Sequence, residues 1–324
     1  MSQYMYRGDG LMAITQELYE DLYGNVCDLS NMTYDELLEL NYSEEVQLAK
    51  NVLTFPPFSE ERSSYMRFAN KKIMQIAFWK KEKSGSLTIY ETNRSYGATD
   101  ASIAMLQRII NIHHTAGTVF TFYEAGVGKG SALKTVAQDG LKIYGCDVFL
   151  SEEAKELAGT RSNIHLIEAD LYLALDTMED SSIDFFYADN VLEHLPPDEY
   201  NETIKKIAAK MKTGGTFFAI IPNSYAGPHD ISKHFITAGE RAQGFHYMEQ
   251  PFSDNVSIFR NNGLELSGLC VQGLDEKIIY LPAFNFLNTI KVRMESLLGK
   301  IRRPGLRKLL FKKLGYSIYI MRKV

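Results

Sequence analysis

The sequence of 324 residues contains no apolar run long enough to cross a bilayer, which takes about 18 to 20 residues. Its first residues, MSQYMYRGDG, do not have the charged and then apolar pattern of a secretory signal, so we expect a cytoplasmic protein. Cysteine is also scarce. Cys27, Cys146 and Cys270 are far apart, which excludes a disulfide framework and a zinc-knuckle spacing. We expect all three cysteines to be reduced and structural.

The composition is ordinary, but charge is unevenly distributed along the chain. Apolar residues make up 45% and charged residues 23%, which excludes a disordered or membrane-embedded class. Residues 1–65 carry a net charge of -9 and residues 291–324 carry +10. The basic block could attract anionic ligands, lipid headgroups or nucleic acid, or it could pair with the acidic block. An overall pI near 5.9 and the lack of a base-stacking module argue against nucleic acid.

Two regions are expected. Residues 1–97 form an all-helical N-terminal extension, because their apolar residues have helical spacing without strand alternation. Pro56 and Pro57 interrupt this extension, and residues 83–97 are a polar connector. Residues 98–324 form one α/β domain, with a basic helical insert at about 276–314.

Strands and helices alternate in the second region. This alternation predicts right-handed crossovers and a parallel sheet that is covered on both faces. The expected strands are 119–124, 142–147, 164–168, 183–188, 216–221, 264–271 and 316–321, and the expected helices are 99–114, 131–138, 151–157 and 198–210.

The stretch FYEAGVGKGSAL places three glycines within five positions after the first of these strands. A P-loop requires Ser or Thr after its Gly-Lys pair, whereas Lys129 is followed by Gly130. The dinucleotide fingerprint requires a third glycine where this chain has Ser131. The turn therefore fits neither a P-loop nor a dinucleotide-binding turn well.

The same turn resembles the first motif of the class I S-adenosylmethionine-dependent methyltransferases, in which an acidic residue precedes G-x-G-x-G. Later stretches resemble further motifs of that family, notably in its small-molecule and sugar methyltransferases. These stretches are GCDVF, EADLY, ADN, LEHLPPDE and MKTGGTFFAIIPN. The resemblance implies a Rossmann-like, seven-stranded, mostly parallel sheet of order 3-2-1-4-5-7-6. It also implies S-adenosyl-L-methionine as cofactor and S-adenosyl-L-homocysteine as product.

The resemblance assigns cofactor-binding roles to acids and glycines that follow successive strands. A carboxylate can oppose the cationic end of the cofactor or accept both ribose hydroxyls, and glycines permit close backbone approach. The implied residues are Glu124 at the cationic end, Gly126, Gly128 and Gly130 in the turn, Asp147 with Val148 at the ribose, Asp170 with Leu171 at the adenine, and Asp189 with Asn190 after the fourth strand.

Methyl transfer to a hydroxyl or amine needs at most one base, and histidine titrates near neutral pH. The candidates are His194 after the fourth strand, and His229 and His234 after the fifth. We expect O-methylation of a small metabolite, such as a sugar or a secondary metabolite. Methylation of nitrogen or carbon and a non-catalytic cofactor-binding module remain open. His246 is expected to have a core or surface role.

Some relatives hold a divalent metal with Glu-x-x-Glu-His and a distant histidine. Here Glu193 and His194 are preceded by Asn190 at the first acidic position, so no metal is expected.

Residues 300–315 form a basic amphipathic segment that could contact a membrane surface or an acidic carrier, although docking on the chain's own sheet is favoured. The sequence leaves the acceptor and the oligomeric state open.

Overall fold

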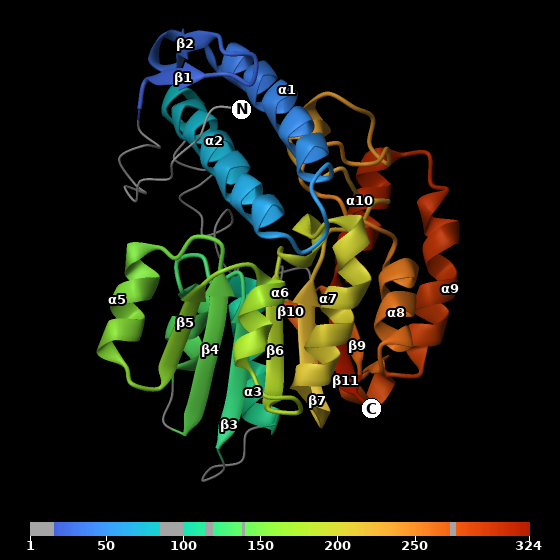
Figure 1. Ribbon diagram of the computed structural model, residues 1–324. Coiled ribbons are helices and arrows are strands. Elements are labelled where there is room, and N and C mark those ends of the chain that lie inside the picture. Colours follow the sequence, from blue (N-terminus) through green and yellow to red (C-terminus); the bar gives the residue numbers. More distant parts are fainter. Residues whose placement is uncertain (1–15, 85–99, 114–118, 138–139, 273–276) are drawn as a thin grey trace. The chain divides into compact units, whose positions relative to one another are not determined.

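The computed structural model describes residues 16–84, 100–113, 119–137, 140–272 and 277–324 (Figure 1). The chain divides into two compact units, Met1–Thr92 and Asn93–Val324. The boundary expected between residues 97 and 98 lies outside the described residues. Among the residues that are described, every helix is too short or too polar to cross a membrane.

The first unit contains the helices α1 (Tyr34–Val52) and α2 (Glu60–Ser84), but it is not all-helical as expected. The strands β1 (Leu18–Glu20) and β2 (Val26–Asp28) pair in antiparallel fashion ahead of α1. Asp21 sets the turn between them, because its carboxylate accepts hydrogen bonds from the backbone N–H groups of Tyr23 and Asn25. Strands of three residues are too short for an alternating pattern to be detected, so the hairpin was missed.

The second unit is built on a seven-stranded sheet of order β5-β4-β3-β6-β7-β11-β8. Numbered from the first strand of this sheet, that order is 3-2-1-4-5-7-6, which confirms the predicted fold class. The first five strands are parallel, and β11 is antiparallel to both of its neighbours. The strands are β3 (Phe120–Ala125), β4 (Leu141–Asp147), β5 (Ile164–Glu168), β6 (Ile183–Asp189), β7 (Met211–Ile220), β8 (Leu264–Leu266) and β11 (Ile318–Lys323).

Both faces of the sheet are covered, because the central strand β3 is buried along its whole length. One face packs in a single apolar cluster against helices α3 (Asp100–His113), α4 (Ser131–Val136) and α5 (Glu152–Thr160). On the other face, Tyr123, Phe186 and Phe217 stack across β3, β6 and β7 with successive ring centroids 5.5 Å apart. The helices α6 (Leu171–Ala174) and α7 (Pro197–Lys210) lie in front of the sheet in Figure 1.

The C-terminal third differs from the expectation at three places. The expected strand 264–271 is broken near Gly268, so β8 stays in the sheet while β9 (Leu269–Gln272) pairs with β10 (Ile278–Leu281). The insert is therefore not purely helical, since β10 precedes its helices α9 (Leu287–Gly299) and α10 (Pro304–Lys313). A further helix, α8 (Phe252–Asn261), was not predicted.

Glu295 of α9 caps the N-terminus of α8. Its buried carboxyl group accepts hydrogen bonds from the backbone N–H groups of Phe252 and Ser253, and from Asn223 Nδ2 at 2.8 Å. The residue before the helix is Pro251, whose side chain makes no capping hydrogen bond. The first turn of α8 therefore depends on a side chain that is distant in sequence.

We expect Glu295→Ala to lower the free energy of unfolding by about 3 kcal/mol, because it leaves buried donors without an acceptor. Urea denaturation measures the change. Glu265→Ala is the matched control, since Glu265 pairs with Arg260 on the surface and such pairs contribute about 0 to 1 kcal/mol. Equal losses in the two variants would contradict the capping role.

Candidate functional site

The glycine turn joins β3 to α4 through backbone conformations that side chains disfavour. Gly126, Gly128 and Gly130 have φ values of 71°, 53° and 73°, in the left-handed region. A Cβ added to Gly126 would lie 2.2 Å from Cγ2 of Val191, which follows β6. The glycines therefore give this turn its path and let it approach the segment after β6.

Asp147 ties the turn to the end of β4. Its Oδ2 accepts a hydrogen bond from the Gly128 N–H at 2.8 Å, and its Oδ1 accepts one from the Phe149 N–H at 3.1 Å. Burial raises the pKa of Asp147, and these amides act in the opposite direction. The carboxyl group is thus fixed beside the turn.

Glu124 lies at the end of β3 and is 2% exposed. Its Oε2 is buried and has no hydrogen-bond partner among the described residues. Burial raises the pKa of Glu124 well above its ordinary value, and the nearby charges of Asp147 and Asp189 raise it further. A buried carboxyl oxygen without a donor is costly, so this position suits a cationic or hydrogen-bonding ligand.

The remaining predicted residues also follow strands. Asp170 is the residue before α6, and Leu171 is buried in that helix. Asp189 ends β6 and accepts a hydrogen bond from Ser102 Oγ of α3 at 2.8 Å, while Asn190 takes a left-handed φ of 54°. Because β5, β4, β3 and β6 are parallel neighbours, all the predicted cofactor residues, Val148 included, lie at one edge of the sheet.

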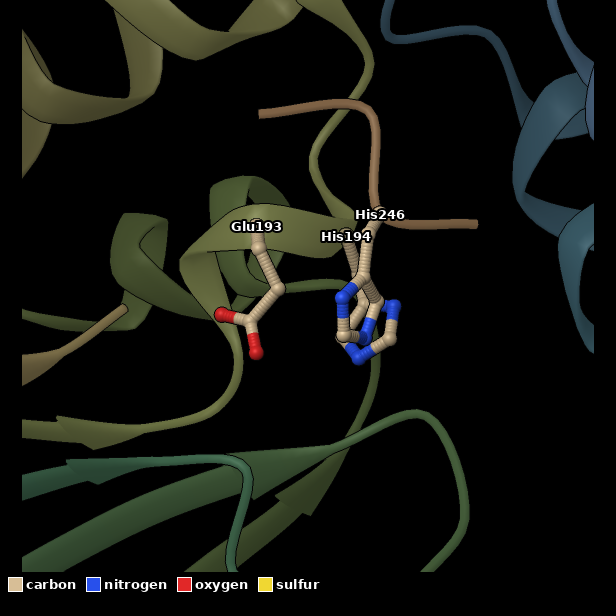
Figure 2. Close-up of side chains that lie close together, drawn as sticks. All are labelled: Glu193, His194 and His246. Atoms are coloured by element: carbon tan, nitrogen blue, oxygen red, sulfur yellow. The ribbon is translucent and has the colours of Figure 1, made fainter. Parts of the chain in front are cut away.

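A second group of side chains follows β6 on the same edge. Glu193 and His194 lie in the short helix η3 (Leu192–His194), and the His194 ring packs edge-to-face on that of His246, with centroids 4.8 Å apart. Figure 2 shows these three side chains extending from two backbone segments toward the same side. A hydrogen bond from Met248 N–H to the Glu193 carbonyl, 2.9 Å long, joins the two segments.

Glu249 connects this group to His229. Its Oε1 lies 2.8 Å from His229 Nδ1, its Oε2 lies 3.1 Å from His246 Nδ1, and its side chain is only 1% exposed. Burial alone would raise the pKa of Glu249, but the hydrogen bonds from the two histidines lower it to about 2. The ionised carboxylate therefore orients both rings.

The three predicted histidines thus have different surroundings. His229 and His194 belong to one network through Glu249 and His246, whereas His234 is exposed at the end of η4 (Ile231–His234). Desolvation and the neighbouring His246 lower the pKa of His194 to about 3, which makes it a weak base. Sequence reasoning gave His246 a core or surface role and overlooked Glu249. Their spacing of three residues in HYME was the available signal.

Residues 123–219 match a family described as "Methyltransferase domain". This span begins in β3 and ends in β7. It includes the glycine turn, Asp147 at the end of β4, Asp189 at the end of β6, and Glu193-His194. Residues 123–219 of this chain therefore form a methyltransferase domain. The sheet has the strand order that the resemblance to the class I S-adenosylmethionine-dependent methyltransferases implied, and the cofactor is S-adenosyl-L-methionine. None of the curated proteins compared with this chain matches it.

Solved methyltransferase structures are similar to this chain at low identity. A SAM-dependent methyltransferase from Archaeoglobus fulgidus is 17% identical over 73% of this chain and all of its own, with a TM-score of 0.44. The 1,6-didemethyltoxoflavin-N1-methyltransferase of Burkholderia thailandensis, solved with S-adenosylhomocysteine, is 15% identical over 61% of this chain and 83% of its own, with a TM-score of 0.43. Because these scores are below 0.5, the assignment rests on the family match and the strand order.

The methyltransferase domain offers surroundings that fit this cofactor. The left-handed glycines leave space for close backbone approach, and the buried Glu124 oxygen faces no donor of the described protein. Glu124 is the residue that would hold the cationic amino group, and Asp147 is the residue that would accept hydrogen bonds from the ribose. The individual contacts stay predictions.

Proposed function

We propose that this methyltransferase transfers a methyl group to a hydroxyl oxygen of a small metabolite, with His229 as the general base. The proposal is carried by the His229–Glu249 pair, in which a buried, ionised carboxylate orients an imidazole ring. The His229 side chain is 29% exposed, so a substrate can reach it. The segment that carries it follows β7, at the carboxyl edge where ligands of such sheets bind.

The chemistry needs little from the protein besides positioning and one base. When bound, the cofactor supplies a sulfonium methyl group, whose carbon–sulfur bond breaks as the acceptor oxygen attacks. With Nδ1–H donating to Glu249, His229 Nε2 is the nitrogen available to take the acceptor's proton. Glu249 holds this tautomer and stabilises the imidazolium that forms, as a carboxylate does beside a catalytic histidine.

The test uses purified protein, cofactor with a labelled methyl group and a fractionated metabolite extract. We expect the label to appear in a small molecule over many turnovers, and mass spectrometry to place the methyl group on oxygen. Label on nitrogen or carbon would overturn the hydroxyl assignment. Cofactor binding without any turnover would favour a non-catalytic module.

Glu124 is expected to lose a proton when the cofactor product binds. Because its pKa is raised in the ligand-free protein, the carboxyl group stays protonated at pH values where an ordinary glutamate is ionised. The cationic amino group of S-adenosylhomocysteine favours the ionised form, so affinity should rise with pH until the raised pKa is passed. Calorimetry in buffers of different ionisation enthalpy counts the protons released. Glu124→Gln should release fewer, and equal release would remove Glu124 from the site.

We also propose that the acceptor, or a carrier to which it is attached, bears an anionic group that meets α10. Tyr225 and Gly227, close in sequence to His229, line a pocket of about 190 Å³ together with Lys233, Arg307 and Lys308. Three cationic side chains around one small pocket favour a carboxylate or phosphate. Under this proposal, the partner contact expected for residues 300–315 would be made at this same pocket.

Substituting Arg307 should therefore affect acceptor binding more than turnover. We expect Arg307→Gln to raise KM for an anionic acceptor about tenfold, the effect of losing a charge-assisted hydrogen bond, with kcat nearly unchanged. Initial-rate kinetics on the identified acceptor measures both constants. Lys205→Gln, a change in an exposed pair on α7, is the control. An unchanged KM would place the acceptor's anionic group elsewhere.

A further inference from the structure

Glu193, His194 and His246 form a group that the proposed base does not use. One ligand atom from each of the three residues can be chosen so that all lie within 4.8 Å of one another. Two imidazoles and one carboxylate are the donors that zinc and related divalent transition ions prefer. The three side chains therefore have the composition of a cation site, and their ligand atoms lie near one another (Figure 2).

Each histidine already has one ring nitrogen engaged. A ring N–H of His194 donates to the backbone carbonyl of Phe245, and Nδ1 of His246 lies 3.1 Å from Glu249 Oε2. Histidines that bind metals are almost always held in this way, by a carbonyl or carboxylate on the nitrogen that does not bind the ion. The second nitrogen of each ring is then left as the acceptor that a cation needs.

Glu193 supplies the third donor and an independent reason for a ligand. Its side chain is fully buried, and neither carboxyl oxygen has a hydrogen-bond partner among the described residues. Buried polar atoms are almost always satisfied, and an unpaired carboxylate in the interior is especially costly. A cation bound by this carboxylate would remove the penalty.

We propose that Glu193, His194 and His246 bind one divalent transition ion of the zinc class, with Glu249 and the Phe245 carbonyl as the groups that orient the ligands. Three protein ligands leave a coordination position open, as in catalytic zinc sites. This site departs from the sequence analysis, which expected no metal.

The role of the open position rests on the methyl transfer proposed above. An acceptor hydroxyl oxygen bound there would have a lowered pKa. His229 would take its proton, and the oxygen would bond to the methyl carbon as the carbon–sulfur bond breaks, leaving S-adenosylhomocysteine as the neutral thioether. Glu249 contacts both His229 and His246, so it would align the base with the ion.

The ion is tested without any methyl-transfer assay. Untagged protein is treated with a chelator, dialysed and titrated with Zn²⁺ and Co²⁺, and bound metal is measured by mass spectrometry and by the visible Co²⁺ spectrum. We expect one ion per chain and an intense Co²⁺ spectrum of low coordination number. Failure of methyl transfer would leave this result intact, so the two proposals fail separately.

Substitutions of the proposed ligands test where the ion binds. His246→Ala and Glu193→Gln should each weaken binding by at least about 100-fold, and Glu249→Gln by about tenfold, the lower end for a residue that orients a ligand. Glu193→Gln keeps the side-chain shape and replaces a buried carboxyl group that has no partner among the described residues by a neutral amide, so it should remain folded and should melt no lower than wild type without metal. His165→Ala, which changes an exposed histidine of β5, should bind as wild type does. Absence of binding at micromolar metal, or equal binding by Glu193→Gln, would overturn the site.

Discussion

Gly126→Ala is expected to reduce the affinity for S-adenosylhomocysteine at least about 30-fold. A residue with a side chain at φ 71° costs roughly 1 to 2 kcal/mol, and the new Cβ would lie 2.2 Å from Val191 Cγ2, an overpacking cost of about 1 to 3 kcal/mol. Val191 is β-branched and cannot easily turn away. The turn must move, and the backbone path that suits the cofactor is lost.

Two further variants separate the two causes of the lost affinity, which are the positive φ and the clash with Val191. Val191→Ala combined with Gly126→Ala removes the clashing atom and should recover the packing part of the loss, but not the part due to the positive φ. Gly159→Ala, in α5 where an added Cβ meets nothing within 4 Å, should bind as wild type does. Calorimetric titration measures affinity, and circular dichroism checks folding. Wild-type affinity in Gly126→Ala would remove the turn from the cofactor site.

His229→Asn is expected to lower kcat by about 10² to 10⁴, the usual contribution of a general base, while the affinity for S-adenosylhomocysteine stays within about twofold. Glu249→Gln should also lower kcat and should shift the pH profile, because it removes the carboxylate that fixes the His229 tautomer. Initial rates on the identified acceptor give both results.

Substitutions of two other histidines test whether His229 is the general base. His165→Asn, on the exposed side of β5, should leave kcat unchanged. His234→Asn should change kcat far less than His229→Asn, since His234 is exposed and the ring that Glu249 orients is that of His229. A larger loss in His234→Asn than in His229→Asn would transfer the role of base to His234.

The sheet, and the gathering of the candidate cofactor residues at one of its edges, could be predicted because the signals are local in sequence. The strands β4, β5 and β6 each end at an acid and β3 ends just before Gly126, and parallel strands bring those ends together whatever the loops do. Asp147 shows the limit of this reasoning. Its position at the end of β4 was predicted, but its hydrogen bonds to the amides of Gly128 and Phe149 depend on loop geometry that no spacing encodes.

The histidine network could not be predicted, because its members come together only in the folded chain. His194 and His246 are 52 residues apart, and the segment that carries His246 is irregular, with no periodicity that indicates a buried face. Helix α8 was missed for a different reason. Phe252, Val256 and Phe259 have helical spacing, but the polar residues between them and the preceding Pro251 masked it.

The central claim is that the glycine turn and the acid at the end of β4 bind the adenosyl part of the cofactor. Calorimetric titration of S-adenosylhomocysteine into wild type and Asp147→Ala tests it most directly. We predict one molecule bound per chain, with most of the affinity lost in the variant, because Asp147 anchors the turn and is the residue predicted to accept hydrogen bonds from the ribose. No binding by wild type at millimolar S-adenosylhomocysteine, or equal affinity in the two proteins, would contradict the claim.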